Sequence, residues 1–160
     1  MAIDGLGDIW VENQFTNITV YASLSVYAQP NTLVQTLTVN PPVYGVAVAG
    51  DYLAYGNSNG TILDAVEPIL TSNAQNGGSY GNMTGVAIGS DNKGNFYVGN
   101  ADGSVDIAFA NGTASTFLFL SFAPTGISVD NVRGRIYISN GPGNSISVYS
   151  TAGALLKVIQ

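Results

Sequence analysis

The chain has 160 residues, of which 46% are hydrophobic, only 9% are charged and 20 are glycine, a composition that favours β-sheets and tight turns over helices. It contains no cysteine and no histidine, which removes disulfides, thiolate metal sites, cysteine nucleophiles and the commonest general base. The net charge is −6 with only four cations, so we expect no nucleic-acid binding, and no apolar run or polybasic segment predicts membrane insertion.

A short strand-like segment that ends in asparagine occurs four times along the chain. The four copies are residues 8–13, 52–57, 95–100 and 135–140. Their terminal residues, Asn13, Asn57, Asn100 and Asn140, are 44, 43 and 40 residues apart. A period in this range predicts an array of supersecondary units rather than one irregular domain.

Three further strands are predicted around this segment. An apolar strand precedes it at residues 45–48, 85–88 and 126–129, and turn residues separate the two. A third strand follows at residues 60–64, 103–107 and 144–149, and a fourth at residues 36–39, 115–120 and 154–159. Four short antiparallel strands per unit of about 40 residues are typical of a β-propeller blade.

We therefore predict an all-β, single-domain β-propeller with almost no helix. Its blades would span approximately residues 1–40, 41–81, 82–122 and 123–160. Residues 124–149 resemble the repeats of NHL and YVTN propellers nearly throughout, residues 83–109 resemble them well, and residues 43–65 resemble them more loosely. The first unit diverges most around residues 19–29. This resemblance implies a scaffold fold and gives almost no information on function.

The first unit aligns with the third without a gap from Asp4 onward. The chain is therefore expected to begin near the end of an innermost strand and to carry about 3.75 blades. It would close as a four-bladed ring, form part of a propeller of roughly six to eight blades, or pair through its ends in a longer assembly. We favour the second outcome, as a fragment or as half of a dimer, because uncovered blade faces promote association.

Two groups of residues are candidates for facing a ligand. The amides of Asn13, Asn57, Asn100 and Asn140 would either line a shared channel or, as their regular spacing favours, cap turns at strand ends. Trp10, with Tyr21, Tyr27 and Tyr80, would stack on a sugar in a lectin-like propeller. Trp10 aligns with Tyr97 and Tyr137, however, which favours a strand residue packed between blades.

The remaining polar motifs have equally plain alternatives. Asp91 and Asp130, with Asp4 in the equivalent position, would either ligate Ca²⁺ or accept local amide hydrogen bonds in Asx-turns, and the single Asp per blade favours the turns. Four sequences fit the N-glycosylation acceptor pattern, at Asn17, Asn59, Asn82 and Asn111. If they are used, the chain is extracellular or on a cell surface.

No residue cluster predicts catalysis, a metal or a cofactor. Asp64 with Glu67, and Asp102 with Asp106, are the close carboxylate pairs, and nothing in the sequence places them in a cleft. We therefore expect a non-catalytic scaffold or binding module that acts through self-association or protein–protein contacts. Its expected partner is a second copy of the chain, further blades of a longer chain, or a protein ligand. A glycan-binding propeller is the main alternative. A fragment of a propeller hydrolase or lyase, with catalytic residues outside this chain, is the second.

Overall fold

The computed structural model describes residues 2–3, 9–13, 17–21, 33–38, 43–49, 52–57, 87–109 and 113–160. Every regular element in these ranges is a β-strand, and none of these residues lies in a helix. The prediction of an all-β chain is therefore confirmed for the described residues. Among them there is also no helix with the length and apolarity needed to cross a membrane.

The strands form four antiparallel sheets, each ordered as in the chain. The first sheet contains β1 (Ala2–Ile3), β2 (Ile9–Asn13), β3 (Asn17–Tyr21) and β4 (Leu33–Thr38), and the second contains β5 (Val43–Ala49) and β6 (Tyr52–Asn57). The third contains β7 (Ala87–Ser90), β8 (Phe96–Gly99), β9 (Ser104–Ala108) and β10 (Ala114–Phe119). The fourth contains β11 (Gly126–Asp130), β12 (Arg135–Asn140), β13 (Ser145–Ser150) and β14 (Leu155–Ile159).

Each sheet lies within one of the four sequence units. The Asn-ending segments correspond to β2, β6, β8 and β12. β3 has no counterpart among the predicted strands, because the first unit diverges there from the repeat. The strand predicted at residues 60–64 lies outside the described residues.

Asx-turns join the first two strands of the third and fourth sheets. Asp91 Oδ1 accepts hydrogen bonds from the Lys93 and Asn95 amides at 2.8 and 2.9 Å. Asp130 Oδ1 accepts hydrogen bonds from the Val132 and Arg133 amides, both at 3.0 Å. These bonds confirm the Asx-turn interpretation, and they fix where each strand ends and the next begins.

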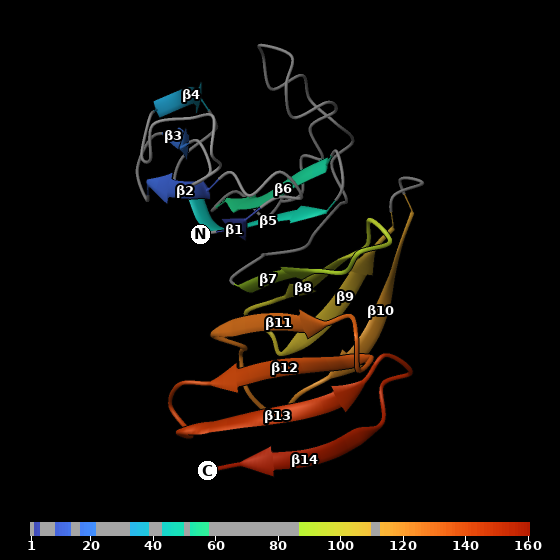
Figure 1. The fold of residues 1–160 in the computed structure, drawn as a ribbon. Coiled ribbons are helices and arrows are strands. Elements are labelled where there is room, and N and C mark those ends of the chain that lie inside the picture. The colour runs from blue at the N-terminus through green and yellow to red at the C-terminus, as the bar shows by residue number, and fades with distance from the viewer. Residues whose placement is uncertain are drawn as a thin grey trace.

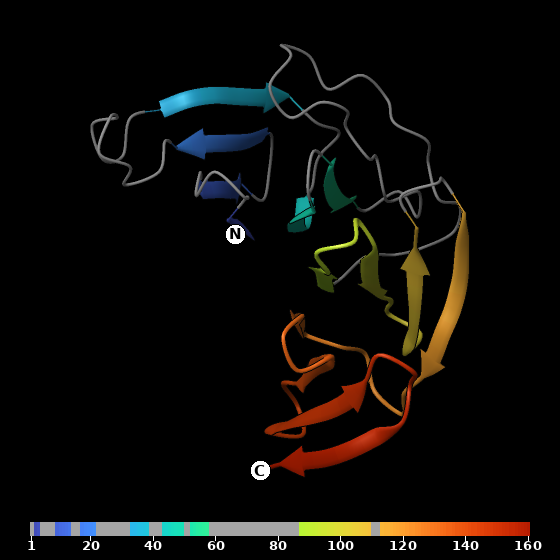
Figure 2. The same ribbon diagram turned by 45° about the vertical axis from the view of Figure 1, so that its right-hand side comes forward.

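The four sheets follow one another along an arc (Figures 1 and 2). β1, β5, β7 and β11 are the edge strands on one side of their sheets, and consecutive members of this series contact one another. The first sheet stands at one end of the arc and the fourth at the other, as Figure 2 shows. This arrangement leaves one face of each end sheet directed away from the rest of the described chain.

Apolar side chains fill the spaces between neighbouring sheets. One buried cluster joins the second and third sheets and includes Ala47, Ile88, Phe96 and Val98. A second cluster joins the third and fourth sheets, where Tyr97 and Val105 meet Ile136 and Ile138. Because side chains alternate along a strand, the third sheet uses one set of positions for the second sheet and the other set for the fourth.

The strand pairing corrects one alignment made from the sequence. Gly45 lies opposite Gly56, Ala87 opposite Gly99 and Gly126 opposite Ser139. Gly45, Ala87 and Gly126 are therefore equivalent, 42 and 39 residues apart, whereas the sequence alignment had placed residue 85 in this position. A shift of two residues keeps every side chain on the same face, so hydrophobic alternation alone could not detect the error.

Candidate functional site

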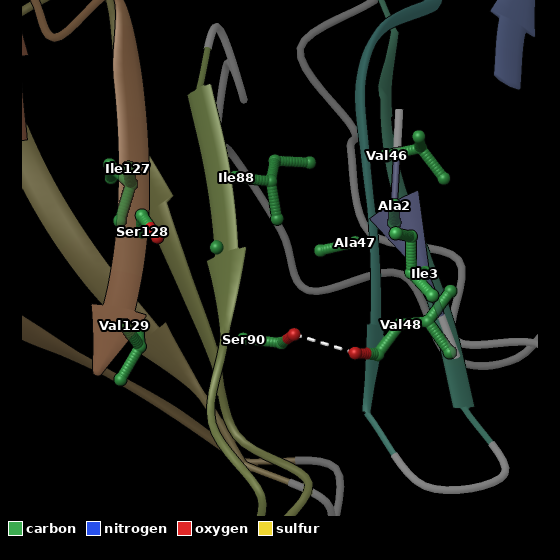
Figure 3. Close-up of a pocket in the computed structure, with 11 residues that line it drawn as sticks. Ala2, Ile3, Val46, Ala47, Val48, Ile88, Ser90, Ile127, Ser128 and Val129 are labelled. Atoms are coloured by element: carbon green, nitrogen blue, oxygen red, sulfur yellow. Dashed lines mark hydrogen bonds between the residues drawn. The ribbon is translucent and has the colours of Figure 1, made fainter. Parts of the chain in front are cut away.

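A hollow of about 200 Å³ lies along the strands that face the inside of the arc. Figure 3 shows how β1, β5, β7 and β11 border it with residues from both faces of each strand. The lining residues are Ala2, Ile3, Val46, Ala47, Val48, Ile88, Gly89, Ser90, Ile127, Ser128 and Val129. β5, β7 and β11 each contribute three consecutive residues to the lining. The hollow is therefore bordered by strand edges rather than by one sheet face.

The corrected register organises these residues into layers. Val46, Ile88 and Ile127 form one layer, since each directly follows one of the three equivalent residues defined above. Ser90 Oγ donates a hydrogen bond of 2.6 Å to the Val48 carbonyl across the gap between the second and third sheets. This bond satisfies one polar group at the open edge of an innermost strand.

The chemistry of the hollow is restricted by its lining. Its side chains are aliphatic, apart from the hydroxyl groups of Ser90 and Ser128 and the bare backbone of Gly89. None of the lining residues titrates near neutral pH, so they supply no general acid, general base or strong metal ligand. Groups of three or more acidic, histidine or cysteine side chains able to hold a metal are likewise absent from the described residues.

Asn100 belongs to a buried polar network in the third sheet. Its Nδ2 donates hydrogen bonds to Ser104 Oγ at 3.0 Å and to Asp106 Oδ2 at 2.7 Å. Ser104 in turn donates from Oγ and from its amide to Asp102 Oδ1, at 2.7 and 2.9 Å. These two bonds, the hydroxyl bond first, lower the pKa of the Asp102 carboxyl. The two carboxylates thus join through Asn100 and Ser104 and anchor the turn between β8 and β9.

Asn140 plays a simpler part at the equivalent turn of the fourth sheet. Its Oδ1 accepts a hydrogen bond of 3.0 Å from the Gly143 amide, which is the turn cap expected for a strand-end asparagine. Asn13 and Asn57 end β2 and β6, and their side chains lie outside the described part of the chain. Neither Asn100 nor Asn140 is among the residues that line the hollow.

The other predicted site residues are dispersed or undescribed. Trp10 lies in β2 opposite Ala2 and Val20, whereas Tyr21 lies opposite Ile9, so Trp10 and Tyr21 form no cross-strand pair. Tyr27, Tyr80, Asp64 and Glu67 lie outside the described residues. Among the glycosylation candidates, Asn17 opens β3, and the other three, Asn59, Asn82 and Asn111, fall outside the described ranges.

The fourth sheet carries a surface that the site residues predicted from sequence do not include. Ile136 and Ile138 point toward the third sheet, so the alternate residues of β12 and their cross-strand partners point the other way. We call this surface the C-terminal end face, and define it by Arg135, Tyr137, Ile146, Val148, Lys157 and Ile159. Ile146 is 39% exposed and Ile159 is 40% exposed, whereas Val148 is 4% exposed.

The outermost strand carries further exposed apolar side chains, of which Leu155 and Val158 lie on the opposite face of the sheet, paired with Tyr149 and Ser147. β14 is exposed along its whole length, and Leu155, Leu156 and Val158 are between 46% and 55% exposed. Large exposed apolar surfaces on a folded chain mark sites of interaction. The alternating pattern at residues 154–159 was visible in the sequence, but it predicts a strand without saying which sheet face stays uncovered.

Comparison with known proteins finds chains of similar fold and leaves the function open. No family model and no curated protein matches the chain. A chain of Kuenenia stuttgartiensis hydrazine synthase matches with a TM-score of 0.75 and 14% identity, over 98% of this chain and 47% of that one. The computationally designed Ika4 protein matches with a TM-score of 0.64 and 13% identity, over 93% and 88%. The chain thus spans about half of the hydrazine synthase chain, and these identities carry the fold alone.

Proposed function

We propose that the chain is a non-catalytic β-propeller scaffold module, with each sheet as one blade, which acts by associating through its uncovered sheet faces. Three four-stranded sheets in chain order, their innermost strands side by side and their arrangement along an arc all support this interpretation. Each blade needs a neighbour on both faces to bury its apolar side chains. A blade with one neighbour therefore offers its other face to a partner.

The observation that carries the proposal is the exposure of the C-terminal end face. Ile146 and Ile159 form a cross-strand pair on this face, and at 39% and 40% exposure they keep a large part of their surface in water. Burying such aliphatic surface contributes about 25 cal/mol per Å². A second surface of matching shape would therefore be stabilised on this face, whether it came from the same chain or from another protein.

The absence of histidine and cysteine from the sequence supports a role without catalysis. Hydrogen bonds lower the pKa values of Asp102 and Asp130, whereas a general acid needs a carboxyl whose pKa is raised toward neutrality. These side chains are suited to hold turns as ionised acceptors. The likeness to hydrazine synthase, at 14% identity, transfers no catalytic residue to this chain.

The test compares the size of the native assembly with and without the end face. In an extract of the source organism, the tagged chain should elute well above its 16.5 kDa, and the double variant Ile146→Lys with Ile159→Lys should elute near that mass. Val132→Lys is the matched control, because Val132 is 93% exposed in the turn between β11 and β12. A wild-type chain that elutes alone at every concentration contradicts the proposal.

We further propose that the module works outside the cell. The support is the set of four N-glycosylation patterns, of which Asn17 is in the described part of the chain. Protein purified from its own source should lose mass on treatment with an endoglycosidase. An unchanged mass would contradict glycosylation at all four positions.

A further inference from the structure

The C-terminal end face repeats a surface that is already covered inside this chain. By strand register, Tyr137 occupies the position of Tyr97, and Ile146 occupies the position of Val105. Tyr97 and Val105 are 4% and 0% exposed because the fourth sheet packs on them. The fourth sheet thus presents the same kind of surface that the third sheet buries, without a described neighbour on it.

The first sheet carries the complementary surface. Ile3, Ile9 and Val11 define what we call the N-terminal end face. They occupy the register positions of Val129, Ile136 and Ile138, which are the residues that the fourth sheet lays on the third. Ile3 is 63% exposed, whereas Ile136 and Ile138 are fully buried. The two ends of the arc therefore hold the two halves of one sheet-to-sheet contact.

We propose that a second copy of this chain covers both faces, with the N-terminal end face of each copy packed on the C-terminal end face of the other. This inference rests on the proposed scaffold function and names its partner. The contact between the third and fourth sheets supplies the template, with Val11 in the place of Ile138, and Ile146 in the place of Val105. Two arcs joined in this way close into one ring.

The charge distribution favours this head-to-tail arrangement. Residues 1–40 contain Asp4, Asp8 and Glu12 and no Lys or Arg, whereas residues 123–160 contain Arg133, Arg135 and Lys157 against Asp130 alone. Arg135 and Lys157 belong to the C-terminal end face itself. Joining unlike ends brings segments of opposite net charge together, whereas joining two first sheets or two fourth sheets brings segments of like net charge together.

Two glycines of the covered contact are replaced by serines on the C-terminal end face. Gly89 and Gly99 of the third sheet correspond to Ser128 and Ser139 of the fourth. Ser139 Oγ lies 3.0 Å from Thr125 Oγ1 and 3.4 Å from the Gly126 carbonyl oxygen, so its hydroxyl is held against its own sheet. Because a Cβ at Gly89 or Gly99 would lie too close to the fourth sheet, a second copy lies slightly farther from the two serines than the fourth sheet lies from the two glycines.

The first test is the mass of the purified full chain in solution, measured by light scattering over a range of concentrations. The expected species has twice the 16.5 kDa of one chain. A closed pair contains the same contact twice. Ile3→Lys and, separately, Ile146→Lys should therefore each lower the affinity between the two chains about tenfold per contact, or about a hundredfold in all. Val132→Lys should leave the mass unchanged. A monomer at every concentration, or an open series of larger masses, overturns the closed pair.

Mixing two oppositely charged variants separates a head-to-tail pair from a symmetric face-to-face pair. When Ile3→Glu is mixed with Ile146→Lys in equal amounts, one contact of the mixed pair is native and the other joins the glutamate to the lysine, so the mixture should form pairs where neither variant does alone. If Ile3→Lys alone still forms pairs, like ends are in contact and the proposal is wrong. Ile159→Lys replaces Ile146→Lys if circular dichroism shows that the latter fails to fold.

Cysteine cross-linking reports the register directly, since the chain has no cysteine of its own. Val11→Cys and Ile146→Cys, made in separate chains and mixed under oxidising conditions, should give a disulfide-linked species of two chains. Either variant alone should give much less of it. Cross-linking that is equally fast in each variant alone contradicts the head-to-tail contact.

The outcomes also separate this inference from the proposed function. Suppose that the purified chain is a monomer, but that the chain in the extract elutes in a large assembly that depends on Ile146 and Ile159. This result would rule out the second copy as the partner and would leave the proposed scaffold function intact. A chain that is alone in both settings would overturn both.

Discussion

The third and fourth sheets share one sequence pattern and differ in their neighbours. The third sheet is packed on both faces, and Tyr97, on the face that meets the fourth sheet, is 4% exposed. Tyr97 stacks edge-on against Phe117, with ring centroids 5.5 Å apart and an interplanar angle of 77°. Tyr137, in the equivalent position of the fourth sheet, is only partly buried. The repeat thus specifies the strand, and the neighbouring sheet decides how the strand's side chains are used.

Glycine marks where a neighbour approaches most closely. A Cβ on Gly89 would lie 2.9 Å from both Cγ2 and the carbonyl oxygen of Ile127. A Cβ on Gly99 would lie 2.6 Å from Pro124 Cγ. The fourth sheet has Ser128 and Ser139 in these two positions, on the face that no described sheet covers. Packing against a neighbour, rather than the strand itself, requires the glycines.

The largest expected difference between the covered and uncovered faces follows truncation of an isoleucine. Ile138→Ala removes a fully buried side chain between the third and fourth sheets and should lower the free energy of unfolding by about 2–5 kcal/mol. Ile146→Ala, at 39% exposure, should cost well under half as much in dilute protein. Urea unfolding monitored by circular dichroism measures both, and equal losses would show that the end face is not uncovered.

A steric substitution tests the same comparison from the opposite direction. Gly89→Val would place its side chain against the backbone of Ile127, which cannot rotate away, and should lower the free energy of unfolding by about 1–3 kcal/mol. Ser128→Val is the matched substitution on the uncovered face and should change it by less than about 0.5 kcal/mol. If Gly89→Val were as well tolerated as Ser128→Val, the close approach of the fourth sheet would be wrong.

These positions also explain what the sequence could predict. β-Branched alternation and Asp-containing turns identified most of the described strands, because both signals are local. The equivalence of Ala87 with Gly45 and Gly126 could not be found in this way, since a two-residue shift preserves alternation. β3 was missed because the first unit departs from the repeat, and its pairing with β2 and β4 became visible only in the sheet.

The candidate site was harder to predict than the fold for the same reason. The repeated asparagines were identified, but the network of Asn100 with Ser104 and Asp106 depends on where the turn between β8 and β9 places three side chains. Asn140, in a turn one residue longer, caps the backbone instead. The end faces depend on which sheets lie at the ends of the arc, and residue type alone does not report that.

Alkaline unfolding should report the burial of Tyr97 on the covered face. Burial, followed by the negative charge of Asp91, raises the pKa of Tyr97 above its ordinary value of 10.0. Its stabilising contribution is therefore complete below pH 10 and is lost as the pH rises from 10 toward the raised value, because the unfolded chain ionises first. Tyr97→Phe should reduce the decline of the unfolding midpoint above pH 10. An unchanged decline would contradict this assignment.

Acid unfolding should give the smallest difference, and salt should reveal its origin. Hydrogen bonds from Ser104 lower the pKa of Asp102, and those from Arg133 lower the pKa of Asp130, each below an ordinary value of 3.8. Both contributions are complete above the unfolded pKa and are lost as the pH falls through the lowered one, so Asp102→Asn and Asp130→Asn should each flatten the stability profile in acid.

The bond from Arg133 Nη1 to Asp130 Oδ2, 3.0 Å long, is an exposed ion pair that salt screens, whereas the donors to Asp102 are the neutral groups of Ser104. Added salt should therefore reduce the effect of Asp130→Asn more than that of Asp102→Asn, in unfolding midpoints measured between pH 2 and pH 5. Equal salt dependence would mean that the ion pair with Arg133 contributes nothing to the effect of Asp130→Asn.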